Sequence, residues 1–205
     1  MTEESLSSTI LGDEEMDTML RGIVSRVLQA HTESDITEVP MHSIACIGSV
    51  SKTETEYAKV EFEMRTVPAN RGVTAETFPD YLGESLAMMA PVIMDEPKKV
   101  LIAFWIIGTA WVAEVDEPVD EVSQEVYENR SEVIMIAGIS LDKRANSSYL
   151  KIRRDDDGAI RVNGEEVFML GVKDSRESME FRMDLTEKAL TKYLTKIVEN
   201  QKGAV

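Results

Sequence analysis

The longest apolar run in the chain, Lys98 to Asp116, constrains the fold more than any other feature. It reads KKVLIAFWIIGTAWVAEVD and holds both tryptophans, Trp105 and Trp111. β-Branched and aromatic residues dominate the run, which favours a strand over a helix. Apolar residues at both strand parities predict the central strand of a sheet, covered on both faces, with the tryptophans in the core. Gly108 interrupts the run, and a glycine inside a strand usually marks a bulge or a bend.

Periodicity elsewhere in the chain predicts the elements around this strand. Apolar residues at helical spacing predict helices over residues 13–31, 78–90 and 185–200. Further strands are predicted at 41–50, 57–67, 131–141, 148–154, 159–162 and 167–172. Asp157-Gly158 and Asn163-Gly164 predict two tight hairpin turns. The order of elements predicts an α+β fold, a largely antiparallel sheet with a long central strand, flanked by three helices.

Composition predicts one domain and excludes some partners. Residues 1–11 are rich in Ser, Thr and Glu and are expected to form a flexible N-terminal arm, followed by a single α+β domain over 12–205. The net charge of −16 argues against binding to nucleic acid polymers and to anionic membranes. The sequence shows neither a signal-peptide pattern nor an uninterrupted apolar run of about 20 residues, so we expect a cytoplasmic protein.

The chain contains only two histidines and one cysteine. His31, His42 and Cys46 match no zinc-ligand spacing, and the apolar neighbours of Cys46 predict a buried thiol. The segment 83–87, GESLA, departs from the nucleophile-elbow pattern at its last position and falls within a predicted helix. Glycine-rich phosphate loops are absent. We therefore predict no catalytic residue, no metal and no cofactor, and favour a protein that is not an enzyme over a hydrolase with an unrecognised site.

One basic cluster stands out against the acidic composition. Residues 143–161 contain six basic side chains: Lys143, Arg144, Lys151, Arg153, Arg154 and Arg161. On a strand Lys151 and Arg153 share a face, and Arg161 on the returning strand can lie close to them. Guanidinium groups match phosphate geometry, so the cluster could hold a small anionic, nucleotide-like ligand. The alternative is a solvated strand face paired with the acidic residues at 155–157 and 165–166.

The region 98–140 resembles a pattern in small uncharacterised proteins of bacteria and their phages. The resemblance is carried by Ala110-Trp111, an acidic linker with a proline, and Asn129-Arg130-Ser131-Glu132 before a second apolar strand. It implies a shared α+β sheet core and a cytoplasmic setting, and no activity. Trp111 and Arg130 are the candidate binding residues in this region. If Arg130 folds back on Glu132 or on the linker, their role is structural.

Three functions remain open from the sequence. The leading hypothesis is a non-catalytic binding or assembly protein that self-associates as a homo-oligomer. Its interface would be Met-rich apolar surface on the first helix or an uncovered sheet edge. The second hypothesis is a protein that holds or sequesters a small anionic ligand, with these binding residues: Lys151, Arg153, Arg154, Arg161, Trp111 and Arg130. The third is a hydrolase with an unrecognised carboxylate site.

Overall fold

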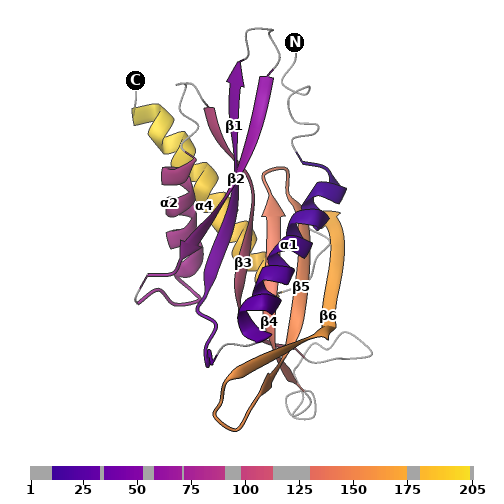
Figure 1. The fold of residues 1–205 in the computed structure, drawn as a ribbon. Coiled ribbons are helices and arrows are strands. Elements are labelled where there is room, and N and C mark those ends of the chain that lie inside the picture. Colours follow the sequence, from indigo (N-terminus) through magenta and orange to yellow (C-terminus); the bar gives the residue numbers. More distant parts are fainter. Residues whose placement is uncertain are drawn as a thin grey trace.

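In the computed structural model, the described residues are 11–32, 35–52, 58–70, 72–90, 98–112, 130–174 and 181–203. They form three helices and a six-stranded, all-antiparallel open sheet, which confirms the α+β prediction (Figure 1). The elements in chain order are α1 (Asp13–Thr32), β1 (His42–Lys52), β2 (Ala58–Pro68), α2 (Phe78–Met89), β3 (Lys98–Val112), β4 (Ser131–Ser140), β5 (Arg144–Arg154), β6 (Ile160–Asp174) and α4 (Phe181–Gly203). The strand order is β2-β1-β3-β4-β5-β6, so β3 is an inner strand, as its sequence predicts.

The sheet lies between two helical layers (Figure 1). Helix α1 crosses one face, over β5 and β6, and α2 and α4 pack together on the other, where α4 contacts β3 and β4. Each layer encloses its own apolar core, and β3 contributes to both: Trp105 packs under α1, whereas Phe104 packs under α2 and α4. The strand residues in the second core come from β1 to β4, with none described from β5 or β6. Consequently, that core does not extend to the edge of the sheet formed by β5 and β6.

The irregularity in β3 falls at Ile102 and not at Gly108, contrary to the prediction. Pairing with β4 continues through Gly108 without a shift, whereas pairing with β1 shifts between Cys46 and Ile47 and leaves Ile102 as the extra residue. Gly48 explains the position, because a Cβ there would lie 3.0 Å from Ile102 Cδ1. The missing side chain makes room for Ile102, and the backbone oxygen of Ile102 accepts a hydrogen bond from the Leu141 N–H at 2.9 Å.

Only the first of the two predicted hairpins beyond β4 forms. The turn at 155–158 is closed by a hydrogen bond from Gly158 N to Asp155 O at 2.9 Å, and Gly158 has a φ of 78°. The second signal, Asn163-Gly164, lies inside β6, which runs without reversal from Ile160 to Asp174. Asn163 Oδ1 there accepts the Glu165 N–H at 3.1 Å, and the register against β5 shifts between Leu150 and Ile152. An asparagine turn is thus used as a bulge in an edge strand.

The helices agree with their predicted positions and differ at their ends. The apolar stripe of α1 packs in the core, with Met19 and Leu28 partly buried and the others fully or nearly buried: Met16, Leu20, Ile23, Val24 and Val27. α2 begins at Phe78 without a side-chain cap from Thr77, and α4 begins at Phe181, ahead of the predicted start at residue 185. None of the described helices combines the length and the apolar character needed to cross a bilayer. The predicted arm, apart from Leu11, and the acidic linker at 116–129 lie outside the described residues.

Candidate functional site

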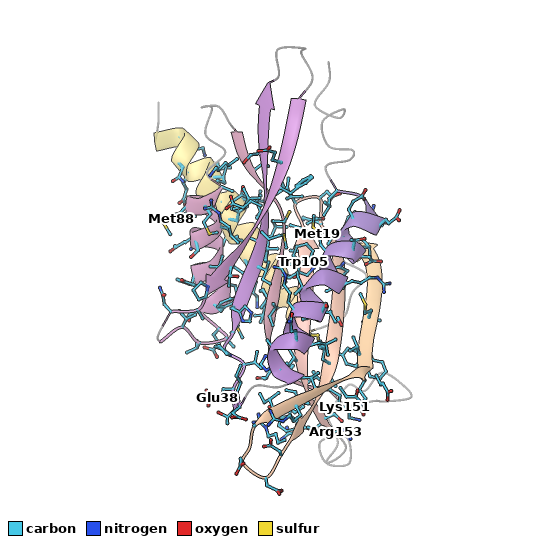
Figure 2. The ribbon with its side chains drawn as sticks, viewed as in Figure 1. Met19, Glu38, Met88, Trp105, Lys151 and Arg153 are labelled. Carbon is cyan, nitrogen blue, oxygen red and sulfur yellow. The ribbon has the colours of Figure 1, made fainter. Side chains whose placement is uncertain are left out.

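The basic residues of β5 and β6 gather as predicted, but their arginines are paired with carboxylates. Arg153 lies directly opposite Arg161 in the β5–β6 ladder. Arg153 Nη2 is 3.0 Å from Glu166 Oε1, and Arg161 Nη2 is 2.8 Å from Asp155 Oδ2. These partners relieve the repulsion between two neighbouring arginines, and an anionic ligand would have to displace them. Figure 2 shows Arg153 beside Lys151 at the end of the sheet that carries the β5–β6 turn.

Arg154 lies on the opposite face of the sheet from Arg153. Its Nη2 and Nε donate to the two carboxylate oxygens of Glu132 at 2.7 and 2.9 Å. Its Nη1 donates to the backbone oxygens of Thr37 and Gly158 at 2.9 and 3.1 Å. The bidentate bond to Glu132 raises the pKa of Arg154 above its usual value. This guanidinium therefore ties β4, the β5–β6 turn and the segment after α1 together, which is a structural task.

Trp111 and Arg130 meet in a cation–π contact. The Arg130 Cζ lies 4.5 Å from the centroid of the Trp111 ring, and Glu132, directly opposite Trp111 in the ladder, is bound to Arg154. Trp111 is 57% exposed, contrary to the prediction that both tryptophans are core. The core beneath α1 takes β3 residues only as far as Ile107, which leaves Trp111 beyond it. The contact is a partly exposed stack of the kind worth about 0.5–1 kcal/mol.

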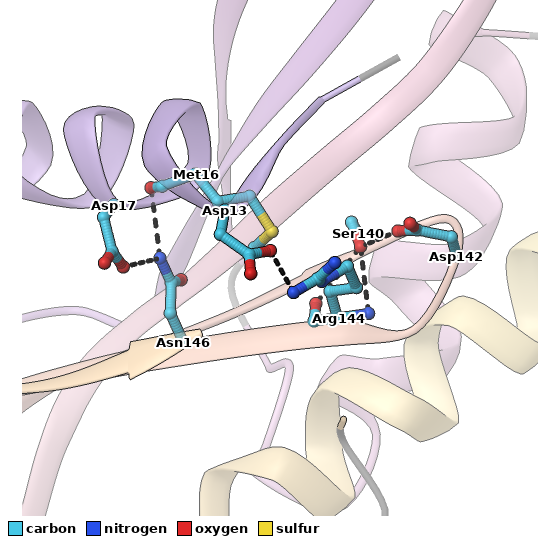
Figure 3. Close-up of polar contacts among 7 residues, drawn as sticks. All are labelled: Asp13, Met16, Asp17, Ser140, Asp142, Arg144 and Asn146. Carbon is cyan, nitrogen blue, oxygen red and sulfur yellow. Dashed lines mark hydrogen bonds and ion pairs between the residues drawn. The ribbon is translucent and has the colours of Figure 1, made fainter. Parts of the chain in front are cut away.

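A buried polar cluster that the sequence did not indicate holds α1 on the sheet. Trp105 Nε1 donates to Asn146 Oδ1 at 2.9 Å, and Asn146 Nδ2 donates to the backbone oxygen of Met16 at 3.0 Å and to Asp17 Oδ1 at 3.2 Å. Figure 3 shows the two bonds from Asn146 to Met16 and Asp17 of α1 beside the ion pair between Arg144 and Asp13. All hydrogen-bonding atoms of the Asn146 amide are thereby used within the fold.

The groups most typical of catalysis are also engaged in the fold. Cys46 is fully buried, as predicted, and burial raises the pKa of its thiol to about 11. Ser85, the candidate of the GESLA segment, donates its hydroxyl to the backbone oxygen of Tyr81 at 2.9 Å. Across the described ranges, no three His, Cys, Asp or Glu side chains gather where they could hold a metal ion.

The exposed apolar residues on β6 form a feature that remains unexplained by the fold. Phe168 and Leu170 are 44% and 38% exposed, and the Phe168 ring stacks on Tyr149 of β5 with centroids 4.7 Å apart. We call Tyr149, Phe168 and Leu170 the β6 patch. The neighbouring residues Val167 and Met169 pack toward the α1 core, so the patch lies on the face that carries α2 and α4.

The two edges of the sheet differ in charge. β2 alternates charged residues along its length, with Glu61 and Glu63 exposed and Arg65 bound to Glu63 at 2.8 Å. Such charges discourage the addition of a further strand. The β6 segment 167–172, VFMLGV, contains no charged residue. The sequence shows that the segment 167–172 is apolar, but its position on an edge strand and the exposure of Phe168 and Leu170 depend on the strand order.

Comparison with protein-family models, with curated proteins and with solved structures gave no match. The candidate site therefore rests on geometry alone. The structure places Lys151, Arg153 and Arg161 together, separates them from Arg154, and puts Trp111 with Arg130. Ligand binding by these residues stays a prediction.

Proposed function

We propose that this protein is a non-catalytic, cytoplasmic assembly protein that self-associates through the β6 patch. The single observation that carries the proposal is the exposed pair Phe168 and Leu170 on an edge strand whose segment 167–172 lacks charge. Apolar side chains on an uncharged edge favour association, because a second strand buries them and satisfies the outer backbone groups.

Two further features support a second copy of the chain as the partner. The apolar stripe of α1, the other interface considered from the sequence, is used in the core. Two chains of charge −16 repel each other, so contact is favoured where carboxylates are sparse. The β6 patch meets this condition better than the β2 edge, and Lys151 and Arg153 follow Tyr149 on the same face of β5.

Substitution of the patch tests the proposal. Full burial of a Leu or Phe contributes about 1.5–3 kcal/mol, and these side chains are already about half buried. A two-fold interface contains each side chain twice, so Leu170→Glu should weaken self-association by about tenfold to a hundredfold. Sedimentation equilibrium measures this directly. Phe62→Glu is the matched control, because Phe62 is 49% exposed on the other edge strand and should leave association unchanged.

Salt dependence separates this interface from docking through the arginines. Salt screens the repulsion between two acidic chains, so association through the β6 patch should persist or strengthen as salt is raised. Association of the Arg153 region of one copy with an acidic surface of another would weaken as salt is raised. Loss of association at high salt, or equal effects of Leu170→Glu and Phe62→Glu, would contradict the proposal.

A further inference from the structure

The regular part of β6 restricts how two edges could meet. Bulges flank it, because the register against β5 shifts between Leu150 and Ile152 and again between Ala145 and Ser147. The uninterrupted ladder between them is Val167–Leu170. Bulges at a strand edge limit pairing with another chain, so an added strand has a short window in which to pair.

The pleat restricts the pairing further. Two copies of β6 pair side by side and antiparallel only about a two-fold axis perpendicular to the sheet. Directly opposed residues must then point to the same face, so the axis has to pass beside a residue and not between two. For a window of 167–170, the axis nearest the middle lies at Phe168 or at Met169.

Side-chain chemistry separates these two positions. An axis at Phe168 places Leu170 opposite Glu166, a carboxylate that already binds Arg153. An axis at Met169 places Phe168 opposite Leu170 twice, once on each side of the axis. This second arrangement joins the two exposed apolar side chains, and Glu166 is then no longer directly opposite Leu170.

We infer that the partner is a second copy joined through β6 in antiparallel register about a two-fold axis at Met169, which makes one continuous twelve-stranded sheet. This inference rests on the proposed function, because it specifies the geometry of the same interface. Each Phe168 then covers the Leu170 of the other copy, and the outer backbone groups of the central segment pair across the axis.

Cysteine pairing tests the register. Directly opposed residues in an antiparallel ladder have Cα atoms about 4.5–5.5 Å apart, within the disulfide range, whereas diagonal neighbours lie about 7–8 Å apart, beyond it. Phe168→Cys and Leu170→Cys chains, one carrying a mass tag, are oxidised separately and as a mixture. Non-reducing electrophoresis should show the mixed dimer from the mixture and little dimer from either variant alone. The native Cys46 is fully buried and gives no background.

Each other outcome has a distinct meaning. A strong disulfide dimer from Phe168→Cys alone would show that the axis lies at Phe168, and one from Leu170→Cys alone would show that it lies at Leu170. Either result overturns the register. Absence of the mixed dimer, while the native chain still sediments as a dimer, overturns the register and leaves the proposed function standing. A native chain that sediments as a monomer overturns both. Phe62→Cys serves as the control, with no dimer expected, and circular dichroism checks that each variant is folded.

Discussion

Replacement of Gly138 by alanine should destabilise the fold strongly, because Gly138 makes the room in which Trp105 lies. Gly138 lies directly opposite Trp105 on β3 and directly opposite Asn146 on β5. The indole crosses the glycine to reach the Asn146 amide, and a Cβ at 138 would lie 2.1 Å from Trp105 Nε1 and 2.2 Å from Cδ1. The ring is rigid and fully buried, so it cannot yield without moving its neighbours.

The magnitude has two contributions. Forced repacking of a full core costs about 1–3 kcal/mol, and a buried donor that loses its partner costs about 1–3 kcal/mol more. We therefore expect Gly138→Ala to lower the free energy of unfolding by about 2–6 kcal/mol, a large part of the 5–15 kcal/mol typical of a domain. If the loss of the Trp105–Asn146 hydrogen bond is a real component, Asn146→Ala should cost less in the Gly138→Ala background than in the native chain.

Urea unfolding followed by circular dichroism measures these effects. Gly22→Ala is the matched control, since Gly22 lies on the exposed side of α1 and an added Cβ meets nothing within 4 Å. That substitution should stabilise the protein by about 0.5–1 kcal/mol through helix propensity. A Gly138→Ala variant within about 0.5 kcal/mol of the native chain would refute the packing argument.

Three further predictions concern ionisable groups. Burial, followed by the neighbouring His42, lowers the pKa of His31 below its usual 6.5, so folding favours the neutral imidazole. The free energy of unfolding should therefore fall as pH drops below about 6.5. His31→Leu should remove this acid dependence, and an unchanged pH profile in that variant would contradict the prediction. Burial raises the pKa of Tyr193 from 10.0 to about 12, so the stabilising effect of the neutral phenol is complete below pH 10.0 and is lost as pH rises toward 12. In the same unfolding assay, Tyr193→Phe should lose less free energy of unfolding between pH 10.0 and 12 than the native chain, although it also removes the 3.2 Å bond to Ala90 O. Arg154→Gln should lower the free energy of unfolding by about 1 kcal/mol, since the ion pair with Glu132 is partly exposed. If Arg154→Gln lowers the free energy of unfolding more than Arg153→Gln does, the bonds from Arg154 to Thr37 and Gly158 contribute to stability.

The sequence predicted what depends on local pattern. Alternation identified β2, helical spacing identified α1, and the apolar run identified β3 as an inner strand. Arg153 and Arg161 pair with Glu166 and Asp155, which agrees with the alternative interpretation of the basic cluster as a solvated strand face paired with nearby carboxylates.

Features set by contacts between distant segments could not be predicted. The Ile102 bulge depends on space above Gly48, and the Asn146 cluster joins β3, β5 and α1. The exposure of Phe168 depends on which strands the second helical layer covers. Asn163-Gly164 has the chemistry of a hairpin turn, but Val162 and Val167 both pair with β5, so the chain bulges instead of reversing.

The molar mass of the native chain in solution tests the central claim most directly. Light scattering during size-exclusion chromatography, repeated over a dilution series, should give twice the chain mass of 22.9 kDa at high concentration and fall toward 22.9 kDa on dilution. A mass of 22.9 kDa at every concentration would contradict self-association through the β6 patch.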